Sequence, residues 1–86
     1  MNTLSIVIPA YNEEAIISTI LAQVAAQEQV DEIIVVDDGS TDNTADAAKE
    51  AGATVVRHPE SLGNGAAIKA GARAATGDII AFMDGD

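Results

Sequence analysis

Short apolar runs alternate along the chain with longer stretches in which apolar residues recur every three or four positions. The first run, residues 4–8, is unbroken, contains Val and Ile and stops at Pro9, as expected for a strand buried on both faces. Residues 32–37 repeat this pattern, and further runs follow at residues 54–57 and 78–83. The sequence therefore predicts four strands of the kind found in parallel sheets.

Three helices are predicted between these strands. Within residues 13–28, apolar residues recur at the spacing of a single helical stripe, at Ile16, Ile17, Ile20, Leu21 and Val24. A second helix ends near Glu50, just before Gly52, which suits a left-handed cap. A third is expected over residues 64–75. This alternation predicts an α/β fold, an open, mostly parallel Rossmann-like sheet with helices on both faces.

The composition excludes several classes of protein. The chain has 86 residues, 48% of them hydrophobic, and a formal net charge of -10 from 14 acidic and 4 basic side chains. The apolar content predicts a folded chain, and the charge argues against nucleic acid, which is bound by clustered Lys and Arg. Without a basic leader or a long apolar run, a cytoplasmic location is expected. The absence of cysteine excludes disulfides and thiolate chemistry.

Acidic residues gather where the predicted strands end, which is where open α/β sheets bind ligands. The carboxylates that follow the first, second and fourth strands are Glu13, Glu14, Asp37, Asp38, Asp84 and Asp86. We expect far fewer at the opposite strand ends. Such crowding is unfavourable unless a cation neutralises it. Asp84 and Asp86 are two positions apart, so both carboxylates can face one ion. Oxygen ligands favour Mg²⁺ or Mn²⁺ as that ion. The alternative is that Asp-Gly-Asp forms an ordinary turn.

Other polar residues near the strand ends allow more than one interpretation. Tyr11 can stack on a nucleobase or pack beneath its loop. One residue of the Ser40-Thr41-Asp42 segment is expected to cap the second helix, which leaves Asp38 to accept a hydrogen bond from a nucleobase or a ribose. His58 precedes a proline and is interpreted as a loop residue rather than a catalytic base.

The third predicted helix combines small and basic residues. Gly65 and Gly71 permit close backbone approach, either to the sheet or to a phosphate at the helix N-terminus. Lys69 and Arg73, one turn apart, can meet a diphosphate or simply be solvated. The spacing of the glycines matches neither the dinucleotide fingerprint nor a P-loop.

Four motifs stand in order along the chain: SIVIPAYNEE at residues 5–14, IVVDDGSTD at 34–42, GNGAA at 63–67 and FMDGD at 82–86. Together they resemble the N-terminal half of family 2 glycosyltransferases with the GT-A fold. The resemblance extends over nearly the whole chain. It implies that residues 1–86 are the nucleotide-binding part of one GT-A domain, truncated at an Asp-X-Asp motif.

The resemblance also implies a nucleotide-diphosphate sugar as donor, with Mg²⁺ or Mn²⁺ as cofactor. The residues expected to bind the nucleotide sugar are Pro9, Ala10, Tyr11, Glu13, Asp38, Lys69, Asp84 and Gly85. Asp38 would accept from the base, and Asp84 and Asp86 would hold the metal. The sugar would pass with inversion to an unknown acceptor, such as a polyprenyl phosphate or a glycan. The catalytic base normally follows the Asp-X-Asp motif, and no residue is assigned to it.

Further expectations follow from this interpretation. The unpaired edge of the last strand favours self-association, and the 86 residues alone are expected to transfer no sugar. For a longer protein, membrane association through its C-terminal part is the alternative to a purely cytoplasmic location. One alternative is a noncatalytic nucleotide-binding fragment. Another is a receiver-type signalling domain, which has a similar acidic pair, although there the pair follows the first strand and here Asp37 and Asp38 follow the second.

Overall fold

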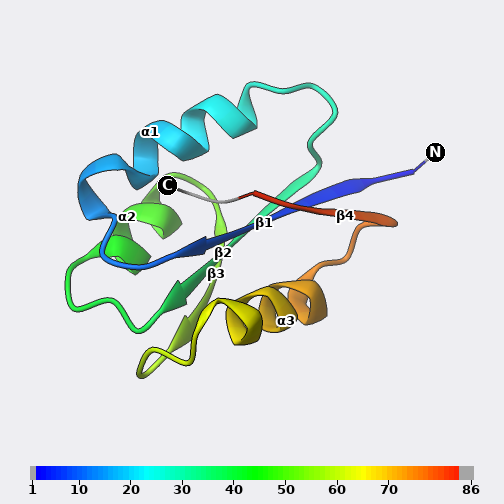
Figure 1. The fold of residues 1–86 in the computed structure, drawn as a ribbon. Coiled ribbons are helices and arrows are strands. Elements are labelled where there is room, and N and C mark those ends of the chain that lie inside the picture. Colours follow the sequence, from blue (N-terminus) through cyan, green and yellow to red (C-terminus); the bar gives the residue numbers. More distant parts are fainter. Residues whose placement is uncertain (1, 84–86) are drawn as a thin grey trace.

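The computed structural model describes residues 2–83, in which strands and helices alternate throughout (Figure 1). The elements are β1 (Leu4–Ala10), α1 (Glu14–Ala25), β2 (Glu32–Asp38), α2 (Thr44–Glu50), β3 (Thr54–His58), α3 (Asn64–Ala74) and β4 (Ile79–Phe82). Every predicted element is present. The largest difference is at α1, which ends at Ala25 because Val24 is its last buried residue and the next positions are exposed. Within residues 2–83, no helix has the length and apolar character needed to cross a membrane.

The strands form one parallel sheet in the order β3-β2-β1-β4. Ile6 of β1, for example, pairs with Ile33 of β2 on one side and Ala81 of β4 on the other. From β1, the chain places β2 and then β3 on one side of that strand. It then returns and places β4 on the other side of β1. The strand order reverses between β1 and β4, so the carboxyl ends of these two strands mark the expected ligand position.

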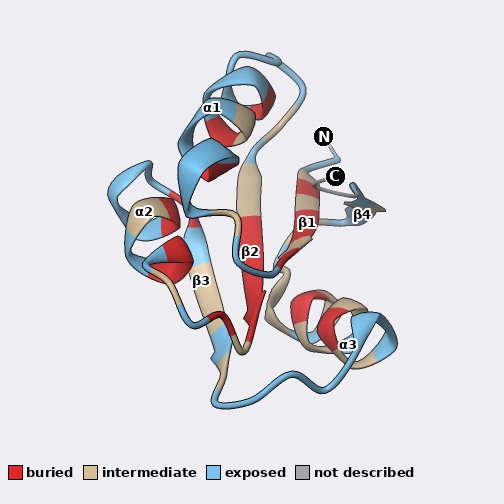
Figure 2. Ribbon diagram, turned by 60° about the vertical axis from the view of Figure 1, so that its left-hand side comes forward, coloured by how far each residue is buried: buried red, intermediate tan, exposed pale blue. Residues whose placement is uncertain are grey.

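Two apolar clusters cover the two faces of the sheet (Figures 1 and 2). The first packs α1 and α2 against one face, and its buried residues are Ile8, Ala10, Ile17, Leu21, Val24, Val35, Ala48 and Ala53. The second packs α3 against the other face through Val7, Ile34, Val36 and Ala67. The predicted α/β class with helices on both faces is confirmed. Ile16 departs from the predicted stripe and is 47% exposed, because it lies to one side of the row formed by Ile17, Leu21 and Val24.

The amino ends of the strands carry more acidic residues than expected: Asp31, Glu32 and Asp78. Each holds the fold together at that edge. The Glu32 carboxylate accepts hydrogen bonds from Ser5 Oγ (2.7 Å) and the Thr76 N–H (2.9 Å), and these contacts, the Thr76 N–H above all, lower the pKa of Glu32. Asp31 and Asp78 accept backbone N–H groups at the N-terminal end of β1. Acidic residues at this edge therefore have structural partners.

The outer edge of β4 is apolar and exposed. Ile79 and Phe82 are 49% and 51% exposed, and among the described strands β4 pairs only with β1. A hollow of about 410 Å³ lies beside it, lined by Ile6, Gln23, Val24, Gln27, Val30, Phe82 and Met83. This hollow is larger than any at the carboxyl ends of the strands, but its lining offers no charged group.

Gly71 explains how α3 packs so closely on the sheet. A Cβ atom at this position would overlap the Val7 side chain and lie 3.1 Å from Val36 Cγ2. At Gly65, in the first turn of the same helix, a Cβ atom would have no neighbour within 4 Å. Of the two sequence interpretations, close packing on the sheet therefore holds for Gly71, whereas the space around Gly65 stays open.

We predict that Gly71→Ala lowers the free energy of unfolding by about 1–3 kcal/mol, because the added methyl group overpacks the sheet despite the better helix propensity of alanine. Gly65→Ala is the matched control in the same helix, and we expect it to be neutral or slightly stabilising. Urea unfolding followed by circular dichroism measures both. Equal effects of the two substitutions would contradict the packing argument.

Candidate functional site

A pocket of about 260 Å³ opens at the carboxyl ends of β1 and β2. Its walls are formed by the ends of β1 and β2, the loops that follow β1 and β3, and the start of α3. The lining residues are Pro9, Ala10, Tyr11, Glu13, Asp38, Ser61, Gly63 and Asn64. A neighbouring hollow of about 220 Å³ shares Pro9 and Asn64 with it and continues to Ile68, Phe82 and Met83. The two hollows together run past the point where the strand order reverses.

Five of the residues predicted to bind a nucleotide sugar come together in this pocket: Pro9, Ala10, Tyr11, Glu13 and Asp38. Lys69 is exposed on α3 and lines neither hollow, so its contact with a diphosphate stays a prediction. Asp84, Gly85 and Asp86 lie outside the described residues, and their roles also stay predictions.

The sequence interpretation missed three lining residues, namely Ser61, Gly63 and Asn64. They belong to the loop between β3 and α3 and to the first position of α3. The signal that could have found them is the position of this segment, because it follows the carboxyl end of a parallel strand, where ligand-binding loops are expected.

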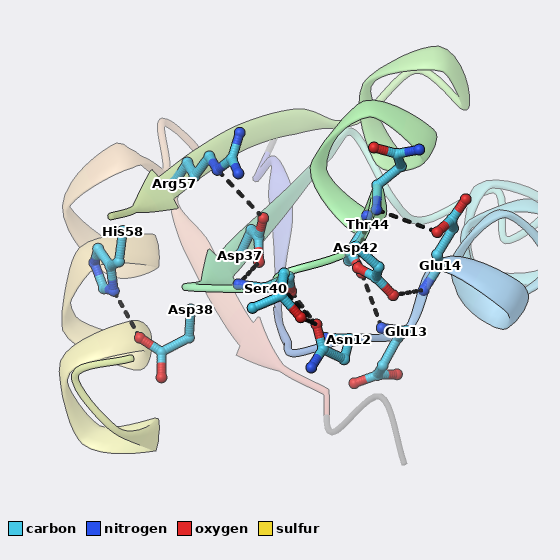
Figure 3. A network of polar contacts seen from close by, with 12 residues as sticks. Asn12, Glu13, Glu14, Asp37, Asp38, Ser40, Asp42, Thr44, Arg57 and His58 are labelled. Atoms are coloured by element: carbon cyan, nitrogen blue, oxygen red, sulfur yellow. Dashed lines mark hydrogen bonds and ion pairs between the residues drawn. The ribbon is translucent and has the colours of Figure 1, made fainter. Parts of the chain in front are cut away.

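The loop after β1 is fixed by hydrogen bonds to the segment after β2 (Figure 3). Ser40 Oγ accepts the Asn12 N–H at 2.8 Å, and the Asn12 side-chain oxygen accepts the Thr41 N–H at 2.8 Å. Thr44 Oγ1 accepts the Glu13 N–H at 2.9 Å. Asn12 has a φ of 50°, a left-handed conformation that asparagine tolerates better than most residues. These bonds set the backbone on either side of Asn12, from which Tyr11 and Glu13 line the pocket.

Asp42 does not cap α2 as expected, because the N-cap residue is Asn43, which makes no side-chain cap hydrogen bond; Asp42 lies one residue earlier. Its Oδ1 accepts the Thr44 N–H at 3.0 Å and the Thr44 hydroxyl, and its Oδ2 accepts the Glu14 N–H at 3.2 Å. The Thr44 hydroxyl is the main cause of the lowered pKa of Asp42. One carboxylate therefore joins the first turns of α1 and α2.

Asp37 faces away from the pocket, contrary to the expectation that all these acids crowd a single ligand site. Its side chain is fully buried, Oδ1 accepts the Ser40 N–H at 3.0 Å, and Oδ2 lies 3.8 Å from Arg57 Nε (Figure 3). Within residues 2–83, no three His, Asp or Glu side chains are placed to hold a metal ion. The metal assignment therefore rests on Asp84 and Asp86 and stays a prediction.

Asp38 is the most heavily hydrogen-bonded carboxylate of the site. Oδ1 lies 2.9 Å from His58 Nδ1 and accepts a hydrogen bond from the Leu62 N–H at 2.9 Å. Oδ2 accepts hydrogen bonds from the Ser61 hydroxyl and the Gly63 N–H, both at 3.0 Å. Burial raises the pKa of this carboxyl group, but the four contacts outweigh it and bring the pKa from the usual 3.8 to about 2. These contacts use acceptor positions on both oxygens, and the hydrogen bond from a nucleobase or a ribose to Asp38 stays a prediction.

Gly39 allows the β3–α3 loop to lie directly on the end of β2. Its φ is +80°, and a Cβ atom here would overlap the backbone of Glu60 and Ser61. The loop therefore both packs against Gly39 and hydrogen-bonds to the neighbouring Asp38.

His58, which the sequence analysis interpreted as a loop residue, is the last residue of β3.

Comparison with known proteins identifies relatives of this chain. The family model for glycosyl transferase family 2 matches residues 5–86. Glucosyl-3-phosphoglycerate synthase of Mycobacterium tuberculosis (strain ATCC 25618 / H37Rv) is 40% identical, over 98% of this chain and 29% of its own length. The chain therefore spans less than a third of the length of this relative.

Two solved structures share the fold closely. The crystal structure of the M. tuberculosis synthase in complex with Mn²⁺, uridine diphosphate and glucosyl-3-phosphoglycerate has a TM-score of 0.83 and 39% identity, and the match covers 99% of this chain and 34% of that one. Mannosyl-3-phosphoglycerate synthase from Rubrobacter xylanophilus has a TM-score of 0.90 and 28% identity, with coverage of 99% and 31%. These matches confirm the predicted partial GT-A fold.

The lowered pKa of Asp38 predicts a pH-dependent contribution to stability. A carboxyl group with a lower pKa in the folded state stabilises the protein fully above its unfolded pKa, and this contribution is lost as the pH falls toward the folded pKa of about 2. Asp38→Asn is therefore expected to destabilise the protein by about 1–3 kcal/mol at pH 7 and by less at pH 3. Urea unfolding of parent and variant at both pH values measures the difference. A difference that does not change with pH would count against these contacts.

Proposed function

Because the chain belongs to glycosyl transferase family 2, we propose that it forms the donor-binding part of an enzyme that transfers a sugar from a nucleotide-diphosphate sugar to an acceptor. The observation that carries this proposal is the pocket at the ends of β1 and β2 and the loops after β1 and β3, since it gathers five residues predicted to bind the donor. Its position beside the reversal of strand order supports the same function.

We assign the nucleoside to this pocket. Tyr11 is 51% exposed at its mouth, which leaves a ring face for stacking on a base. Pro9 and Ala10 offer apolar contacts, and the Glu13 carboxylate is an acceptor suited to ribose hydroxyls. The adjoining hollow continues past Asn64 toward the end of β4. The diphosphate and the sugar would extend from the nucleoside into this hollow.

Asp84 and Asp86 are the proposed ligands of Mg²⁺ or Mn²⁺. Carboxylate oxygens suit both ions, and two carboxylates leave coordination positions for phosphate oxygens. The chemistry of the described pocket fits a metal, because Glu13 and Asp38 would repel a diphosphate that arrived without a cation. The bound ion would neutralise the charge that develops on the departing nucleotide. The relative crystallised with Mn²⁺ and uridine diphosphate supports this assignment.

Uridine diphosphate and phosphoglycerate are the first donor and acceptor chemistries to test, because the M. tuberculosis relative was crystallised with uridine diphosphate and glucosyl-3-phosphoglycerate. Polyprenyl phosphates and glycans are the next acceptors. Inversion at the anomeric carbon is part of the proposal. The receiver alternative loses its support, because Asp37 is buried against Arg57 and the chain belongs to a transferase family.

The proposed metal site predicts that uridine diphosphate binds only when Mn²⁺ or Mg²⁺ is present. We expect Asp84→Ala and Asp86→Ala each to abolish this binding, since either change removes a proposed ligand. Isothermal titration calorimetry with uridine diphosphate, with and without Mn²⁺, measures the effect. Asp46→Ala, an exposed acid on α2, is the matched control and should bind as the parent does. Unchanged affinity in the Asp84 and Asp86 variants would reject the metal assignment.

The exposed edge of β4 makes a second copy of the chain a proposed partner. Unpaired apolar strand edges associate, and a charged residue on such an edge prevents it. We predict that the 86-residue chain self-associates and that Ile79→Lys shifts it toward the monomer in sedimentation velocity. Ile16→Lys is the matched control, because Ile16 on α1 is 47% exposed and Ile79 is 49% exposed. Equal effects of the two substitutions would show that β4 is not the contact.

A further inference from the structure

The strand that leads to the proposed metal ligands is weakly fixed by apolar burial. β4 is four residues long, lies at the edge of the sheet, and among the described strands pairs only with β1 (Figure 2). The register of a strand is normally specified by the burial of one of its faces. In β4, however, the side chains of Ile79, Ile80 and Phe82 are all exposed. Another interaction must therefore hold β4 in its observed register.

Hydrogen bonds at the amino ends of the strands supply this constraint. Thr76 and Gly77, which connect α3 to β4, donate their N–H groups to Glu32 Oε1 and to Ser5 Oγ, both at 2.9 Å. Ser5 Oγ in turn donates to Glu32 Oε1 at 2.7 Å. Ser5 is fully buried, so its hydroxyl group cannot exchange these partners for water. These four residues, which we call the amino-end network, join β1, β2 and the segment before β4.

Gly77 makes the amino-end network compatible with a single register. A Cβ atom at Gly77 would overlap Ser5 Oγ and lie only 3.0 Å from the Ser5 backbone nitrogen. If β4 slipped by one residue along β1, Thr76 or Asp78 would take the place of Gly77, and both carry a Cβ atom. The slipped arrangements therefore clash with β1, whereas the observed arrangement does not.

The register of β4 matters because the proposed metal ligands follow this strand, while the nucleoside pocket is built on β1 and β2. Each strand residue advances the chain by about 3.3 Å, so a slip of one residue would displace Asp84 and Asp86 by about that distance relative to β1. Bonds from oxygen ligands to Mg²⁺ are about 2.0–2.1 Å long, and the ion demands near-ideal geometry. A slipped or unpaired β4 would therefore separate the metal from the nucleoside pocket.

We propose that Ser5 and Glu32 are positioning residues for metal-dependent donor binding: together with Gly77 they fix the register of β4 on β1, and they thereby place Asp84 and Asp86 relative to the nucleoside pocket. This inference rests on the proposed donor-binding function and its metal site. It assigns a role in ligand affinity to residues at the edge of the sheet opposite the pocket.

The test compares two substitutions of Glu32. Glu32→Ala removes the oxygen that accepts from Ser5 and Thr76, whereas Glu32→Gln keeps an acceptor oxygen on a side chain of the same length. With Mn²⁺ present, we expect Glu32→Ala to weaken uridine diphosphate binding about tenfold, as the loss of a hydrogen bond to a charged group would, and Glu32→Gln to stay within about threefold of the parent. Isothermal titration calorimetry measures both. Glu28→Ala, an exposed acid in the turn before β2, is the matched control and should bind as the parent does.

Uridine without metal provides the readout that separates positioning from general damage to the site. Uridine needs only the nucleoside pocket, so its affinity, measured by NMR titration, should be the same in Glu32→Ala and in the parent. Equal losses for uridine and uridine diphosphate would overturn the inference, because the nucleoside pocket itself would then be disturbed. Parent affinity for both ligands in Glu32→Ala would also overturn it and would leave the proposed function intact.

Hydrogen exchange of the protein without ligand or metal reports on the pairing of β4 with β1. The Ile79 and Met83 amides donate to carbonyl groups of residues 3 and 7 in the observed register, so both should exchange faster in Glu32→Ala than in the parent. Unchanged rates at these two amides would contradict the inference. If Glu32→Ala does not fold, Ser5→Ala, which removes only a hydroxyl group, decides by the same three measurements. No binding of uridine diphosphate by the parent protein would overturn both the function and the inference.

Discussion

The arrangement of the site depends on the hydrogen bonds made by residues 37–44, which comprise the end of β2, the segment that follows it and the first residue of α2. In the sheet order β3-β2-β1-β4, β2 lies between β1 and β3, so the segment after it can reach the loops that follow both neighbours. Ser40 and Thr44 bind the loop after β1, and Asp38 binds the loop after β3. The loops after β1 and β3, which are distant in sequence, are thereby brought together at the end of β2. The pocket is a consequence of this arrangement, since its lining comes from both loops, from the ends of β1 and β2 and from the first residue of α3.

Because of these bonds, much of the negative charge at this edge of the sheet has a structural role. Asp37, Asp38 and Asp42 each accept backbone N–H groups of the loops, and ionised carboxylates are the strongest acceptors available for that purpose. The accepted bonds keep the pKa of Asp38 and of Asp42 low, so both groups are charged for structural reasons before any ligand arrives. An acidic strand end is therefore not by itself a metal site, and the proposed ion depends on Asp84 and Asp86.

Features that depend on local sequence pattern could be predicted from the sequence. Features that depend on contacts between residues far apart in the chain could not. Apolar runs located the strands, and the alternation with helices fixed the parallel fold, because both signals lie within a few residues. The partners of Asp38 lie 20 to 25 residues further along the chain, and no local pattern indicates them. The strand order and the exposure of Ile16 likewise depend on how elements pack. The resemblance placed Pro9 to Glu13 correctly beside Asp38 but could not reveal that Asp38 was already bonded.

Relatives that are named for different sugars share the fold of this chain. A glucosyl and a mannosyl synthase have TM-scores of 0.83 and 0.90 against this chain, so the same backbone accompanies transfer of two different sugars. The pocket described here lies at the ends of β1 and β2 and in the loops after β1 and β3, so the proposed nucleoside site belongs to the part of the fold that both synthases share with this chain.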